Sequence, residues 1–282
     1  MRQHTKAILY ILLTGIGFSL MSVFVRLSGD VPTMEKAFFR NIVAAAVALA
    51  ALLKSEEHLS IRKGSLPGLL MRSLFGAAGI IANFYAIDHL HIADANILNK
   101  LSPFFAILMS AVILREIPRR SDFLCVLVAL AGAAIVVKPT RGLASLPALV
   151  GLFGGFAAGT AYTYVRKLRL QGERGPVIVL FFSVFSFLVC LPGMLLDFQP
   201  LQPKQLLYLI LAGVSAAVGQ FSVTKAYSLA PAKEISVFDY SQVLFAALWG
   251  FLFFSEHPDA VSVIGYVLIL GAAFFRWNAE RK

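Results

Sequence analysis

Polar side chains recur at helical spacing within one otherwise apolar segment. Asn96, Asn99, Lys100 and Pro103 occupy positions i, i+3, i+4 and i+7, which places them on one face of a helix. An ammonium group among apolar residues is costly unless a carbonyl, an acid or a bound anion accompanies it. This face therefore predicts either a binding site for a solute or a lysine that pairs with a neighbouring helix and only contributes packing.

A second polar face lies near the other end of the chain. It consists of Ser236, Asp239 and Tyr240, with Gln242 just beyond. Asp239 is the most interior acid, and such a group can carry a proton, bind a cation or neutralise a lysine. The alternative is a buried ion pair, with Lys225 as the partner, that serves packing alone. We expect Asp239 to contact a bound solute and to bind a proton or a cation.

The predicted substrate site also includes polar residues of three other apolar segments. Tyrosines there can stack on a solute or donate a hydrogen bond to it, although a lone tyrosine often anchors a helix at the membrane surface. Arg72 is expected to extend its guanidinium to that surface. The predicted binding residues are Asn83, Tyr85, Asn96, Asn99, Lys100, Tyr162, Gln220, Lys225, Asp239, Tyr240 and Gln242.

The segments that carry these residues are too apolar for a protein in water. Of 282 residues, 59% are hydrophobic and only 14% are charged, and the mean hydropathy is +0.79. Soluble domains are usually about 25% charged, so the solvent must be lipid. This excludes a soluble enzyme, a nucleic-acid-binding module and a disordered chain. Cys125 and Cys190 lie in apolar runs and are expected to be small packing residues.

Charged residues, prolines and glycines divide the chain into ten apolar runs. A helix needs about 20 such residues to cross a bilayer, and the runs lack the period-2 alternation of strands. We predict an all-α integral membrane protein of ten transmembrane helices, the first of them a span rather than a signal peptide. The predicted spans are 7–28, 34–53, 66–88, 92–114, 121–138, 146–165, 176–196, 204–228, 233–254 and 258–277.

The basic residues predict the orientation. If the N-terminus is cytoplasmic, sixteen Lys and Arg fall in cytoplasmic segments. The outer segments then hold Lys36, Lys138, Arg141 and Lys204. Because cytoplasmic loops carry an excess of basic residues, we expect both termini inside. The net charge of +10 thus reflects orientation and predicts no nucleic-acid partner.

The chain also resembles itself at an offset of 140 residues. Landmarks that match are Gly15 with Gly155, Arg26 with Arg166, and Glu116-x-Pro118 with Glu256-x-Pro258. Each copy holds five spans, an odd number, so the second copy must cross the membrane inverted. We predict two inverted five-helix repeats, residues 1–140 and 141–282. Inverted repeats are typical of secondary transporters, in which they underlie alternating access; a duplicated channel or scaffold is the alternative.

Two stretches carry a family resemblance. ANILNKLSPFFAILMSAVILREIP, residues 95–118, and ISVFDYSQVLFAALWGFLFFSEHP, residues 235–258, resemble the fourth and ninth helices of EamA-type members of the drug/metabolite transporter superfamily. The resemblance implies ten helices in two repeats and a central cavity lined by helices 1, 3, 4, 6, 8 and 9. It also implies that Arg40 braces helix ends. Pro103 is matched by Val243 in the second repeat, so the two copies differ there.

The expected function is secondary active transport of a small organic metabolite across the cytoplasmic membrane. Two lysines, Lys100 and Lys225, outnumber the interior acid Asp239, which favours an anionic or zwitterionic solute such as an amino acid or a carboxylate. The alternatives are an exporter of amphipathic or cationic drugs and a passive channel or scaffold. An intramembrane enzyme would need a histidine cluster or paired acids within the spans.

The sequence predicts neither a cofactor nor a metal site. Energy is then expected from a proton, sodium or solute gradient, with Asp239 as the coupling residue. Ten spans can enclose a cavity within one chain, so we expect a monomer, with a dimer through Gly132 and Gly271 as the alternative.

Overall fold

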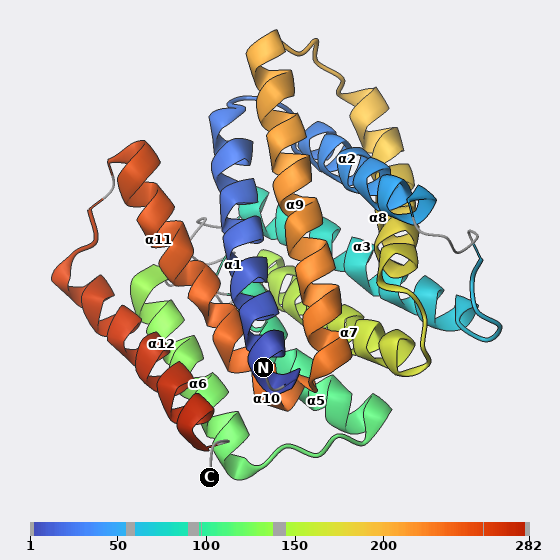
Figure 1. Cartoon of the computed structure of the whole chain (residues 1–282). Helices are drawn as coiled ribbons and strands as arrows, with labels where there is room; N and C mark the ends of the chain where they lie inside the picture. The colour runs from blue at the N-terminus through green and yellow to red at the C-terminus, as the bar shows by residue number, and fades with distance from the viewer. Residues whose placement is uncertain are drawn as a thin grey trace.

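The computed structural model describes residues 3–54, 60–89, 96, 98–137, 145–255 and 257–279, and in these residues the chain is helical and forms no strand (Figure 1). Arg2, Lys138, Arg141, Glu256, Arg281 and Lys282, which enter the charge count or the repeat, lie outside them.

Helices lie within the predicted spans, although the fourth, 92–114, is described only at residue 96 and from residue 98 on. Eight helical segments are long and apolar enough to cross a membrane, and a shorter apolar helix, α5, accompanies them. The expected all-helical membrane architecture is thus confirmed. The helices are α1 (Gln3–Leu27), α2 (Thr33–Leu53), α3 (Leu66–His89), α5 (Ser102–Leu114), α6 (Arg120–Val137), α7 (Leu146–Leu170), α8 (Gly175–Leu196), α9 (Pro203–Leu229), α10 (Ala232–Ile235), η2 (Ser236–Tyr240), α11 (Ser241–Phe254) and α12 (Ala260–Ala279).

Prolines fix where several helices begin. Pro103, Pro147, Pro176 and Pro203 stand in the first turn of α5, α7, α8 and α9, where the missing N–H costs no helical hydrogen bond. Pro103 therefore starts α5 instead of bending a longer helix.

The ninth predicted span is not one regular α-helix. Its polar residues lie in η2, a 3₁₀ segment between α10 and α11. Side chains three residues apart eclipse one another in a 3₁₀ helix, so Ser236 and Asp239 lie on the same side. Tertiary packing of this buried turn overrides the regular helix that the spacing predicted.

Small residues allow the helices to approach closely. α1 packs on α9, α3 on α7, α2 on α8, and α6 on α12 (Figure 1). A Cβ atom on Gly17 would lie 2.7 Å from the backbone nitrogen of Gly219, and one on Gly132 would lie 2.7 Å from the carbonyl oxygen of Gly265. Such contacts are typical of membrane helix interfaces. Gly132 is thus used within the chain and does not serve the dimer contact considered above, whereas Gly271 faces open space.

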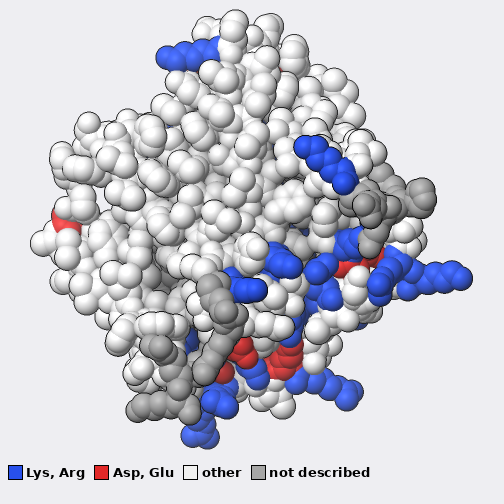
Figure 2. All heavy atoms as spheres, in the orientation of Figure 1, with Lys and Arg blue, Asp and Glu red and all other residues white. Residues whose placement is uncertain are grey.

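One end of the bundle, here called the charged end, holds the start of α1, the end of α5, α10 and the end of α12 (Figure 1). Lys, Arg, Asp and Glu gather along it, while the rest of the visible surface is mostly uncharged (Figure 2). Two ion pairs join elements there: Arg166 Nη2 lies 3.1 Å from Glu116 Oε1, and Arg276 Nε lies 3.4 Å from Asp122 Oδ1. These two ion pairs therefore hold neighbouring helices together at the charged end.

Candidate functional site

A buried arginine occupies the middle of the bundle. Arg72, on α3, is only 3% exposed. Its Nη2 donates a hydrogen bond of 3.1 Å to Oε1 of Gln220 on α9. Its guanidinium lies over the ring of Phe182 on α8, 3.9 Å from the ring centroid, a favourable cation–π geometry. The expectation that Arg72 reaches the membrane surface was wrong, because three helices enclose its side chain.

A glycine makes room for this guanidinium. Gly76 follows Arg72 by one turn of α3, and a Cβ atom there would lie 2.3 Å from Arg72 Nη1 and 2.5 Å from a ring carbon of Phe182. Neither approach is sterically possible without movement. Gly76 therefore leaves the space that the Arg72 side chain occupies, and both residues belong to α3.

Arg40 of α2 is a second cation on the same side. Its Nε lies 3.0 Å from Met21 Sδ, and its Nη1 donates a hydrogen bond of 2.9 Å to Oδ1 of Asn41. It interacts electrostatically with Arg72 and Tyr162. Arg40 thus contacts α1 and its own neighbour on α2, and the bracing role that the family resemblance implied stays a prediction.

Lys100 and the ninth span meet directly. The Lys100 ammonium donates a hydrogen bond of 2.5 Å to Gln242 Oε1, and the Tyr240 hydroxyl donates one of 2.9 Å to the Lys100 carbonyl oxygen. Asp239, half-buried in η2, interacts electrostatically with Lys100. These contacts join two polar faces that the sequence placed 140 residues apart.

Two tyrosines connect the lysine side of the site to the arginine side. The rings of Tyr162 and Tyr227 stack, with centroids 5.6 Å apart and planes 16° apart. Tyr162 interacts electrostatically with Asp239, Arg72 and Arg40. We call the resulting group the central polar cluster: Arg40, Arg72, Lys100, Tyr162, Gln220, Asp239 and Gln242.

The charge of the central polar cluster is unbalanced. Within the part of the chain that the structure describes, it contains three cationic side chains and one carboxylate, Asp239. A buried cation without a counter-ion is costly, so a bound anion would be stabilised here. The guanidinium of Arg72 also offers the planar donor geometry that suits carboxylates and phosphates.

Some predicted binding residues lie outside this cluster. Lys225 of α9 is exposed, so it is not the partner of Asp239; Lys100 takes that place. Tyr85 stacks on His89 near the end of α3, with ring centroids 4.1 Å apart. Asn96 is exposed.

Asn83 and Asn99 are half-buried, and their role stays a prediction. Of the predicted residues, the structure gathers Lys100, Tyr162, Gln220, Asp239, Tyr240 and Gln242.

Two cations, Arg40 and Arg72, were missing from the predicted site. A usable signal was present in the sequence, since an arginine well inside an apolar run usually faces the interior of the bundle. Gly76, one turn after Arg72, was a second signal.

Comparison with known proteins gives the family. The model of the "EamA-like transporter family" matches the chain twice, over residues 5–138 and 145–277. The chain is 35% identical over 270 residues to a pseudopaline exporter of Pseudomonas aeruginosa, covering 95% of this chain and 94% of that one. It is 25% identical to a riboflavin transporter of Vibrio cholerae, covering 97% and 94% of the two chains.

A crystal structure shares the fold. It superimposes with a TM-score of 0.81 at 19% identity and covers 96% of both chains. The family match and the relatives indicate a multi-pass membrane transporter rather than an enzyme. The chain belongs to the EamA-like transporter family.

Proposed function

We propose that this protein exports a small anionic or zwitterionic metabolite from the cytoplasm by secondary active transport, with the central polar cluster as its substrate site. The observation that carries the proposal is the burial of Arg72 at 3% exposure in a cluster with three cationic groups and one acid. Desolvating a guanidinium is offset when an anionic substrate binds beside it.

The cluster offers complementary groups to such a solute. Arg72 and Arg40 supply guanidinium donors for a carboxylate or phosphate. Asp239 can accept a hydrogen bond from the ammonium group of a zwitterion while Lys100 donates its own hydrogen bond to Gln242. The stacked rings of Tyr162 and Tyr227 provide a flat apolar surface for the rest of the molecule. A permanently cationic drug would meet net repulsion, which disfavours that alternative.

Asp239 is the proposed coupling group. It lies beside Lys100 and Tyr162, so its protonation would change the charge that a bound solute encounters. Binding of a proton or a sodium ion at this carboxylate would then alter the affinity for the solute by the same factor as the solute alters that for the ion.

Two inverted repeats would provide the alternating access. The family model matches each half once, and helices at corresponding positions exchange contacts: α1 packs on α9 as α7 packs on α3. Arg115 and Ser255, 140 residues apart in sequence, end α5 and α11 in the same left-handed conformation, with φ of 58° and 54°. Similar packing in both halves would give inward-open and outward-open states similar energy.

Orientation and direction follow from charge and from the relatives. The charged end is proposed to face the cytoplasm with both termini, which leaves the ion pair of Glu116 and Arg166 on the inner side. Export is proposed because the 35% identical relative is named an exporter, and the bacterial relatives suggest the cytoplasmic membrane.

The test is counterflow in proteoliposomes that contain the purified protein. Vesicles are loaded with members of a panel of amino acids, carboxylates and organic cations, and uptake of the same labelled solute is measured. A carrier shows uptake that is stimulated by the load, while a channel or scaffold does not. We expect stimulation by anionic or zwitterionic solutes and its loss in Arg72→Gln, with Lys204→Gln at the opposite end of α9 as the control. Stimulation by permanent cations alone would contradict the proposal.

A further inference from the structure

A second groove shares no lining residue with the central polar cluster. It has a volume of about 420 Å³ and is formed at the charged end by α1, α2, the end of α7, the start of α8 and α9. Three basic residues line it, Arg169, Arg174 and Lys225. We call it the basic groove. Of the α9 residues that line it, Lys225 is exposed and Phe221 is half-buried.

The basic groove contains donors that have no hydrogen-bond partner among the described residues. Arg169 Nε and Thr224 Oγ1 are both buried and both unsatisfied, although each lines the groove. Buried polar atoms are normally paired, so each unpaired one indicates a missing ligand or water. The exposed ammonium of Lys225 adds a positive charge beside them.

Among the described residues, the acid next to Arg174 in sequence, Glu173, is already hydrogen-bonded. Glu173 is fully buried, and its carboxylate accepts hydrogen bonds from the backbone nitrogens of Arg62 and Arg174, at 3.0 Å and 2.9 Å. Its carbonyl oxygen accepts a hydrogen bond from Arg169 Nη1. Among the described residues that line or adjoin the groove, three basic side chains thus stand against this one acid.

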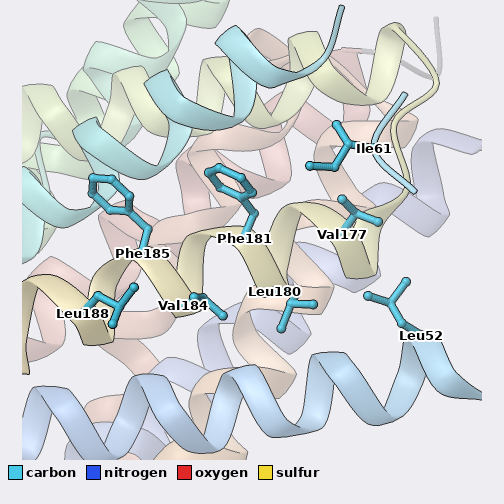
Figure 3. A pocket seen from close by; sticks show the side chains of 8 residues that line it. All are labelled: Leu52, Ile61, Val177, Leu180, Phe181, Val184, Phe185 and Leu188. Atoms are coloured by element: carbon cyan, nitrogen blue, oxygen red, sulfur yellow. The ribbon is translucent and has the colours of Figure 1, made fainter. Parts of the chain in front are cut away.

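An apolar groove of about 340 Å³ adjoins the basic one. It runs along α8 from Leu188 to Val177, and Leu52 of α2 lies near its Val177 end (Figure 3). Leu52 lines both grooves, so the basic groove and the apolar groove meet at this residue.

We propose that these two grooves together bind one anionic phospholipid, with its phosphate in the basic groove and an acyl chain along α8. A free phosphate would use the donors but leave the apolar groove empty, whereas a lipid matches both the charge and the apolar surface. Basic pockets between membrane helices are suited to such headgroups. Thr224 is one turn from Gln220 on α9, so the lipid contacts the helix that also carries part of the central polar cluster.

The experiment measures lipid binding to the purified full-length protein in detergent by native mass spectrometry. Phosphatidylglycerol and phosphatidylcholine with identical acyl chains are compared at equal concentrations. We expect one phosphatidylglycerol to bind preferentially. We expect Lys225→Gln and Arg169→Gln each to weaken its binding about fivefold, since a basic residue contributes about 1 kcal/mol to anionic lipid binding. Lys204→Gln, an exposed lysine at the other end of α9, is the matched control and should bind as the wild type does.

Two further arms separate the lipid from a soluble anion. Val184→Trp fills the apolar groove and should weaken phosphatidylglycerol binding while leaving the basic groove intact. Glycerol 3-phosphate should displace the lipid only at far higher concentration. The proposal would be overturned if glycerol 3-phosphate displaced phosphatidylglycerol at an equal concentration, or if the two phospholipids bound equally well. Because Arg169 also bonds to Glu173, Lys225→Gln decides the outcome if Arg169→Gln does not fold.

Discussion

The hydroxyl of Tyr240 donates a hydrogen bond of 2.9 Å to the backbone carbonyl of Lys100, 140 residues away. This separation equals the offset at which the sequence matches itself. Corresponding positions of the two halves therefore touch in the centre of the bundle, as expected if an axis relating the halves passes near them.

Removing this contact tests how far it holds the halves together. Tyr240 is fully buried, so Tyr240→Phe keeps the ring and deletes only the donor. We expect a loss of about 1 kcal/mol of stability, the typical net value of one hydrogen bond, measured as a lower thermal unfolding midpoint in detergent. Tyr266→Phe, half-buried on α12, is the control; an equal loss there would show that the contact between halves is unimportant.

Gly76 is predicted to be required for substrate binding through Arg72. Gly76→Ala places a methyl group where the guanidinium and Phe182 now lie and should move Arg72 away from Gln220. Hydrogen bonds to charged groups contribute about 1.5–3 kcal/mol, so solute affinity should fall roughly tenfold or more in an equilibrium binding measurement. Gly271→Ala, at a position with nothing within 4 Å, should bind normally. Unchanged affinity in Gly76→Ala would argue against a substrate role for Arg72.

Asp239 is predicted to couple transport to the ion gradient. Asp239→Asn keeps the shape of the side chain and removes its titration, so accumulation driven by an imposed pH gradient should be lost while solute exchange persists. Proteoliposome uptake with and without the gradient separates the two. Asp197→Asn, at the exposed end of α8, should retain both. If gradient-driven accumulation survives in Asp239→Asn, the coupling group lies elsewhere or the carboxylate only packs against Lys100.

The proposed inversion predicts opposite accessibility at corresponding loops. Ser121 is the second residue of α6 and Ala260 is the first of α12, and the two stand just after Pro118 and Pro258. In whole cells, a cysteine introduced at Ala260 should react with a membrane-impermeant thiol reagent, and one at Ser121 should not. Cys125 and Cys190 are buried, so the wild type serves as the background. Reaction at both sites would rule out inverted repeats.

The sequence by itself determined the membrane architecture and the family. Length and apolarity of a run decide whether it spans a bilayer, and both are local properties. The helices of the described residues accordingly fall within the predicted runs. Lys100 and Asp239 were also identifiable, because charged residues inside apolar runs are rare enough to stand out.

Only the tertiary structure decided which cations face the centre. Arg72 and Lys225 both lie within apolar helices, yet Arg72 is buried against Gln220 and Lys225 is exposed. On α9, Gln220 and Lys225 are five residues apart, which turns them about 140° from each other around the helix axis. The rotation of a helix is set by its neighbours, here by the close packing of α1 on α9, and no single apolar run contains that information.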